Sequence, residues 1–138
     1  MKISETDILL KAAFTKRLVL FGDPETDCFR IFNSSGDGID GLTLDWYNGY
    51  ILVQYYRSGV QWGIDHIVAR TVSCAGLLPQ PVKGILVKNR MPVHDPEGKE
   101  KWKSLTAHGT YPEGGTVVRQ NGILMAADLV NGQNTGIF

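Results

Sequence analysis

The stretch LTLDWYNGYILVQY, residues 42–55, constrains the fold more than any other part of this sequence. Apolar and polar residues alternate over residues 42–47, which is the pattern of a strand with one buried face. The Asn48-Gly49 pair that follows is the strongest short signal for a two-residue hairpin turn, and the alternation resumes over residues 51–55. The sequence therefore predicts an antiparallel hairpin of two half-buried strands.

Two helices and a second hairpin are predicted around this centre. Apolar residues at helical spacing predict helices over residues 4–17 and 64–75, the second starting at a capping pair formed by Ser58 and Gln61. Short apolar runs at residues 28–32 and 84–88 predict strands. Asn121-Gly122 predicts another hairpin, and residues 91–115 read as a long polar excursion carrying a short strand or two.

The order helix, hairpin, helix, strand, hairpin is typical of the α+β class. We expect residues 1–138 to form a single α+β domain: a mostly antiparallel sheet built from two hairpins, with two helices packed on one face.

Composition excludes several classes of protein. The 138 residues hold 14 Lys and Arg against 14 Asp and Glu, and a chain of zero net charge is not expected to bind nucleic acid on its own. No apolar run approaches the roughly 20 residues of a membrane span, and the N-terminus is too polar for a signal peptide. Cys28 and Cys74 are expected to be free thiols of a cytoplasmic protein rather than a disulfide.

Metal sites are not predicted. Asp37, Asp40 and Asp45 lie near glycines, but their spacing does not fit a calcium loop, and the first two read as turn residues that bond local backbone. The three histidines are scattered, without the spacing of a zinc site.

No catalytic residue is predicted either. Cys74 has no partner base in sight and reads as a structural cysteine. Asp45 and Asp128 each lie on a predicted strand beside a turn; paired acid–base chemistry and plain exposure to water are both open for them. The glycines lie in hairpin turns and form no nucleotide-binding loop.

Two motifs carry a resemblance to a known family. CFRIFNSSGDGIDGLTLDWYNGYILVQ and VVRQNGILMAADLVNGQNTGIF resemble, in order and spacing, two segments of bacterial S-adenosylmethionine-dependent 23S rRNA cytosine-C5 methyltransferases. The resemblance implies that this chain is the central α+β domain, which in that family lies between an RNA-binding PUA domain and a Rossmann-like catalytic domain. We therefore expect a catalytic domain to follow Phe138, and this chain to be inactive alone.

The matched and the changed positions are named residue by residue. The first motif is matched by Asp37, Gly38, Gly41, Leu42, Asp45 and Tyr47, and the second by Asn121, Gly122, Asp128, Gly132, Gln133, Thr135, Gly136 and Phe138. Asp40 replaces a proline, Trp46 an arginine, Gln120 a glutamate, Asn134 a lysine and Ile137 an aromatic residue.

The resemblance also implies site residues. Gln133, Thr135 and Gly136 would offer an amide, a hydroxyl and a close-approaching backbone to S-adenosylmethionine in the full-length enzyme; a purely structural hinge is the alternative. Candidates for a basic strip facing rRNA are Arg30, Arg57, Lys88 and Arg90, with ordinary solvated surface as the alternative.

Two functions from different classes remain. The first is an accessory, substrate-presenting domain of an rRNA methyltransferase. The second is a stand-alone binding module that has the same fold and no catalytic partner. The gene sequence beyond Phe138 distinguishes them, because a glycine-rich strand-to-helix loop and a cysteine motif favour the first, and a stop codon the second.

Overall fold

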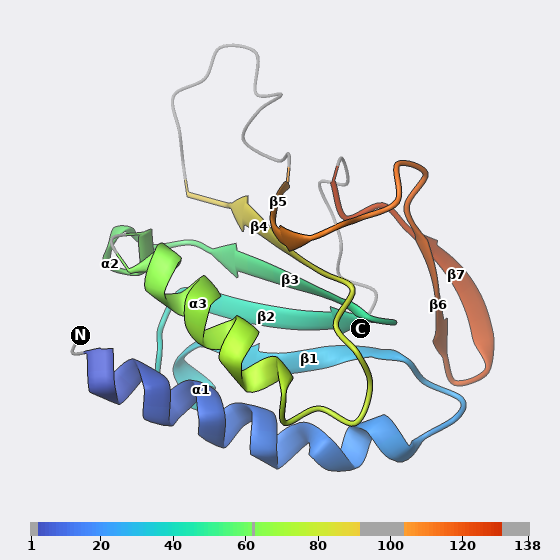
Figure 1. The fold of residues 1–138 in the computed structure, drawn as a ribbon, viewed down its shortest axis with the longest axis horizontal. Coiled ribbons are helices and arrows are strands. Elements are labelled where there is room, and N and C mark those ends of the chain that lie inside the picture. Colours follow the sequence, from blue (N-terminus) through green and yellow to red (C-terminus); the bar gives the residue numbers. More distant parts are fainter. Residues whose placement is uncertain (1–2, 62, 92–103, 131–138) are drawn as a thin grey trace.

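The computed structural model describes residues 3–61, 63–91 and 104–130 of the chain. A five-stranded sheet in the order β1-β2-β3-β4-β5 forms its centre, with α1 and α3 across one face and the separate hairpin β6–β7 beside it (Figure 1). The helices are α1 (Ile3–Arg17), α2 (Ser58–Gln61) and α3 (Ile64–Ala75), with 3₁₀ helices at Leu18–Gly22 and Ser34–Asp37. The strands are β1 (Cys28–Asn33), β2 (Leu42–Tyr47), β3 (Tyr50–Tyr55), β4 (Gly84–Asn89), β5 (Leu105–Gly109), β6 (Thr116–Gln120) and β7 (Ile123–Ala127).

The predicted fold class is confirmed. Every neighbouring pair of strands is antiparallel except β3 and β4, which run parallel. The parallel pair follows from the order of the chain, because α2 and α3 lie between these strands and return the chain to the same end of the sheet. None of the helices in the described residues combines the length and apolar character that crossing a membrane requires.

The β2–β3 hairpin forms where the Asn-Gly pair predicts it. Asn48 and Gly49 have φ angles of 45° and 102°, the left-handed values that a two-residue turn of this type needs. The strands pair without a bulge from Tyr47 opposite Tyr50 to Leu42 opposite Tyr55.

The prediction that these two strands are half-buried is wrong. All six residues of β2 and all six of β3 are buried. On one face Leu44 and Trp46 pack with Leu10 of α1 and Ile67 of α3. Since the hairpin β6–β7 packs against part of the other face, polar residues there are buried as well.

The core explains one of the changed motif positions. Trp46, which stands where the resembled family has an arginine, is 0% exposed and its ring lies 5.0 Å from that of Phe21. Position 46 therefore belongs to the interior of this domain, so its side chain makes no surface contact.

Three segments differ in detail from the predictions. The second helix is divided into α2 and α3, rather than running on from Ser58. The second hairpin forms around Asn121 and Gly122, but as a sheet of its own. Of the polar excursion, residues 104–115 carry β5, an edge strand with all five residues exposed, and residues 92–103 lie outside the described part.

Candidate functional site

The four cations predicted to face rRNA lie on or just after three strands of the sheet. Arg30 is on β1, Lys88 is on β4 and Arg90 follows β4, while Arg57 follows β3. Their exposure differs. Lys88 is 0% exposed, whereas the side chains of Arg30 and Arg57 are 35% and 67% exposed. Arg57 is thus the most accessible of these three.

A buried polar strip crosses the face of the sheet opposite the helices. We define the polar strip as Arg30, Thr43, Asp45, Gln54 and Lys88. Strand register places Thr43, Gln54 and Lys88 opposite one another on β2, β3 and β4. Cross-strand partners share a face of the sheet, so these side chains lie in one row.

Charge within the polar strip is compensated by hydrogen bonds. Arg30 donates from Nε to Asp45 Oδ1 at 2.7 Å and from Nη2 to Oδ2 at 3.2 Å. Burial raises the pKa of Asp45, while hydrogen bonds from Arg30 and Gln54 oppose that rise. Asp45 is 1% exposed, so the reading in which it faces water is wrong, and its guanidinium partner explains why a carboxylate can be buried there.

Lys88 is the other buried charge of the polar strip. Burial, together with the nearby positive charge of Arg90, lowers the pKa of Lys88 to about 8, against the opposing effect of Asp128. The lowered pKa means that the charged form of Lys88 is less favourable here than in water. The prediction that Arg30, Lys88 and Arg90 contact RNA stays a prediction.

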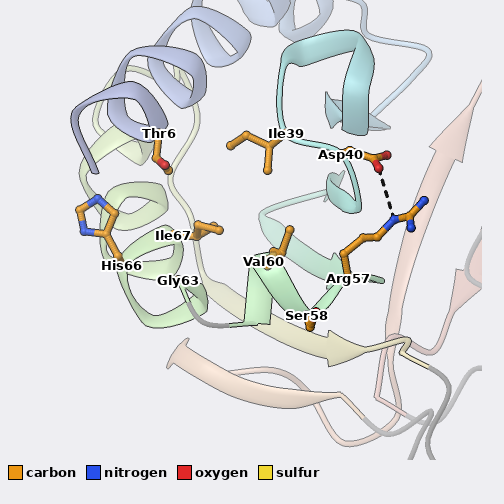
Figure 2. A pocket seen from close by; sticks show the side chains of 10 residues that line it. Thr6, Ile39, Asp40, Arg57, Ser58, Val60, Gly63, His66 and Ile67 are labelled. Carbon is orange, nitrogen blue, oxygen red and sulfur yellow. Dashed lines mark ion pairs between the residues drawn. The ribbon is translucent and has the colours of Figure 1, made fainter. Parts of the chain in front are cut away.

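The pocket of Figure 2 has room for a ligand. It has a volume of about 800 Å³ and lies between α1, α3, α2 and the segment before β2. Ile39, Val60 and Ile67 give it an apolar lining, each at most 5% exposed. Its size is within the range of small-molecule sites.

Polar side chains stand on opposite sides of the pocket. Arg57 Nε lies 3.2 Å from Asp40 Oδ2 on one side, and His66 stands across from this pair (Figure 2). His66 Nε2 lies 2.9 Å from Asp7 Oδ1, an oxygen that Arg70 Nε approaches to 3.6 Å. These pairs leave little net charge, so the pocket favours an apolar group edged by hydrogen-bonding atoms over a bare phosphate.

Most of the pocket was missed by sequence reasoning. The sequence points to Arg57 alone among the lining residues as a binding residue, and His66 is one of three scattered histidines. His66 and Asp7 are 59 residues apart on different helices, so no local motif could reveal the pair. Helical periodicity gives no signal for it either, because His66 lies off the stripe of α3 that carries Ile67 and Thr71.

Asp37 has the structural role predicted for the two turn acids, Asp37 and Asp40. Asp37 Oδ2 accepts from the backbone amide of Asn33 at 2.7 Å, as the turn interpretation requires, and the carboxylate also binds Arg17. Asp40 instead pairs with the Arg57 side chain.

The described residues contain neither a reactive cysteine nor a metal centre. Cys28 and Cys74 are buried free thiols, as predicted, and burial together with Asp27 raises the pKa of Cys28 to about 11. Such a thiol is protonated and unreactive at neutral pH.

Among residues 3–61, 63–91 and 104–130, no group of three His, Cys, Asp or Glu side chains could hold a metal ion. The predicted cofactor residues Gln133, Thr135 and Gly136 lie outside the described residues.

Comparison with known proteins gives this domain its context. YwbD of Bacillus subtilis, named as a ribosomal RNA large subunit methyltransferase, is 35% identical over 94% of this chain. Ribosomal RNA large subunit methyltransferase I of Alteromonas mediterranea is 30% identical, also over 94%. The homologues of this chain are ribosomal RNA large subunit methyltransferases. The chain spans 31% of the length of each of these two relatives.

Solved structures agree with the curated relatives. A SAM-dependent methyltransferase from Streptococcus mutans superposes on the whole chain with a TM-score of 0.81 and 25% identity, and the chain covers 33% of it. A methyltransferase complexed with SAH gives the same values. No protein-family model matches the chain.

Proposed function

We propose that this chain is the accessory, substrate-presenting domain of an S-adenosylmethionine-dependent methyltransferase that modifies cytosine C5 in 23S rRNA in the cytoplasm. The observation that carries the proposal is the extent of the match: 94% of the chain aligns with one third of a ribosomal RNA methyltransferase. The superposition over the full chain supports it independently of sequence motifs. The cytosine-C5 specificity is supported by the two sequence motifs.

In this proposal the domain helps to present RNA, and another domain performs the chemistry. Within the described residues both cysteines are buried, and neither has the accessible, low-pKa thiol that a covalent attack needs. S-adenosylmethionine would be bound largely by the catalytic domain, with Gln133, Thr135 and Gly136 contributing from the end of this sequence. Arg57, exposed on the edge of the pocket, is the first candidate for an RNA contact.

A chimeric enzyme tests the proposal. The chain replaces the 129-residue aligned segment of the Alteromonas mediterranea methyltransferase. Methyl transfer to 23S rRNA from cells lacking that enzyme is then measured, with 5-methylcytidine identified by mass spectrometry. We expect the chimera to methylate and the isolated chain to be inactive. Arg57→Ala should lower kcat/KM for rRNA by about 3-fold to 10-fold and leave S-adenosylmethionine affinity unchanged.

Two outcomes would count against the proposal. Methyl transfer by the isolated chain that survives repeated purification would show that the chemistry resides here. A folded chimera that binds S-adenosylmethionine but leaves rRNA unmodified would favour a stand-alone binding module.

In the chimera, Thr135→Val removes a hydroxyl while keeping the shape, and unchanged cofactor affinity would leave the hinge as the better account of residues 132–138.

A further inference from the structure

Strand β7 is an open edge of unusual composition. Its sequence is ILMAA, five residues without a charge or a proline. One edge of β7 pairs with β6, and the far side of β6 is bound to the segment before β1, where Asp27 N donates to Arg119 O and Gly122 N donates to Glu25 O, both at 2.8 Å. Within the described residues no backbone hydrogen bond crosses the other edge of β7, which is the outermost strand of the hairpin (Figure 1).

One face of the same hairpin is apolar and exposed. Val118 and Ala127 point into the core, at 0% and 6% exposure. The opposite face, which we call the outer face of the hairpin, carries Val117, Leu124 and Ala126 together with one cation, Arg119, directly across from Leu124. Val117 is 55% exposed and Leu124 is 62% exposed.

An edge of this kind requires a cover. Natural proteins protect exposed edge strands with lysines, prolines or bulges, because a bare apolar edge recruits other chains. β7 has none of these devices, and its register with β6 is regular. A two-stranded sheet is also marginally stable without packing on its faces. Within the described residues, the outer face and the open edge of β7 therefore form a mostly apolar surface without a partner.

We propose that this surface docks the catalytic domain of the same methyltransferase polypeptide, which covers the outer face and the open edge of β7. The proposal rests on the proposed function. The relatives and the superposed structure are about three times the length of this chain, so a full-length protein holds further chain to cover an exposed apolar surface of this domain. An RNA occupant is disfavoured because Arg119 is the one cation among the four outer-face residues, and phosphate binding needs several.

Hydrogen exchange of β7 tests the docking directly. Backbone amide exchange of residues 123–127 is compared in the isolated chain and in the Alteromonas chimera, both without RNA. We expect the outward-facing amides of β7 to exchange at least tenfold more slowly in the chimera. Leu124→Lys, which places a charge on the outer face, should restore fast exchange there. Val19→Lys is the matched control, since Val19 is 79% exposed in a 3₁₀ helix outside the hairpin, and it should change nothing at β7.

The possible results separate this inference from the proposed function. A chimera that methylates rRNA with β7 exchange unchanged would overturn the docking and leave the function standing. A chimera with protected β7 amides but no methylation would overturn the proposed function and leave the docking standing. Protection that arises only when rRNA is added would assign the surface to RNA. A dimer of the isolated chain that Leu124→Lys dissociates, measured by sedimentation velocity, would assign it to a second copy. Either of these last two results also overturns the proposal.

Discussion

Asp37 shows how one residue joins distant parts of this fold. Its carboxylate receives two hydrogen bonds from Arg17, at 2.7 and 2.6 Å, and a third from the backbone amide of Asn33. The Arg17 and Asp37 side chains are only 13% and 7% exposed. The pair therefore fastens the end of α1 to the 3₁₀ helix before β2, which borders the segment that carries Ile39 and Asp40 of the pocket. A bidentate arginine–carboxylate contact also fixes orientation as well as distance.

Asp37→Asn should lower the free energy of unfolding by about 2–3 kcal/mol at pH 7, because it leaves Arg17 buried without its counter-charge. Burial would raise the pKa of Asp37, but the hydrogen bonds from Arg17 and Asn33 outweigh it, and the pKa lies below its ordinary value of 3.8. The stabilisation is therefore present above about pH 4 and is lost as pH falls further. Urea unfolding of both proteins at pH 7, 4 and 2.5 should show the difference shrinking only at the acid end.

Asp40→Asn is the control for this residue-scale prediction. Its partner Arg57 and Asp40 itself are both more than 60% exposed, so the loss should stay below about 1 kcal/mol. Equal losses for the two variants at pH 7 would show that burial of the Arg17–Asp37 pair contributes nothing.

At the scale of elements, turn geometry sets the register of the central hairpin. A side chain added at Gly49 would face a φ of 102° and would meet Lys83 side-chain carbons at 3.0–3.2 Å. Lys83 can move, so the strain comes mainly from the backbone. The same left-handed geometry recurs at Asn121 and Gly122, which close the β6–β7 hairpin.

Gly49→Ala should destabilise the domain by about 1–2 kcal/mol, because alanine must adopt a left-handed backbone conformation in a two-residue turn. Gly114→Ala is the matched control: nothing lies within 4 Å of the added carbon and the backbone there does not have positive φ. That control should change the free energy of unfolding by less than about 0.5 kcal/mol. Thermal and urea unfolding of both variants measure the contrast, and a harmless Gly49→Ala would mean that the turn does not determine the register.

Across the whole molecule, basic and acidic side chains are equal in number. The chain has 14 basic and 14 acidic residues, and the ion pairs Arg17–Asp37 and Arg30–Asp45 neutralise two arginines internally. A domain of this kind can help to position RNA that other domains hold, but has little electrostatic attraction of its own.

The isolated chain should therefore bind 23S rRNA fragments with a dissociation constant above about 1 μM at 150 mM salt, and more weakly as salt rises. Fluorescence anisotropy at 50 and 200 mM salt gives the slope of log affinity against log salt. Arg57→Ala should reduce that slope by about 1, whereas Lys16→Ala, on the exposed side of α1, should leave it unchanged. Tight binding that is independent of salt would contradict this account.

Local sequence patterns were enough to predict much of the fold. Alternation and an Asn-Gly pair located β2–β3, helical spacing located α1 and α3, and the β6–β7 hairpin followed from Asn121-Gly122. These features depend on residues within a few positions of each other, since turn geometry and backbone periodicity are local properties. The motifs likewise pointed to methyltransferase relatives, because a motif is itself a local pattern.

Tertiary structure alone decided what is buried and what is brought together. Alternating sequence predicts one covered face for β2, but whether the second face is covered depends on a hairpin some 70 residues later, which buries Tyr47 with Val118. Asp45 can lie in the interior only because Arg30, on the neighbouring strand, reaches it. The pocket joins His66 to Asp7 across two helices, and no pattern in either helix encodes the other. The elements themselves are determined by short stretches of sequence. Burial and ion pairing arise between segments far apart in the chain, so they are decided only when the elements pack.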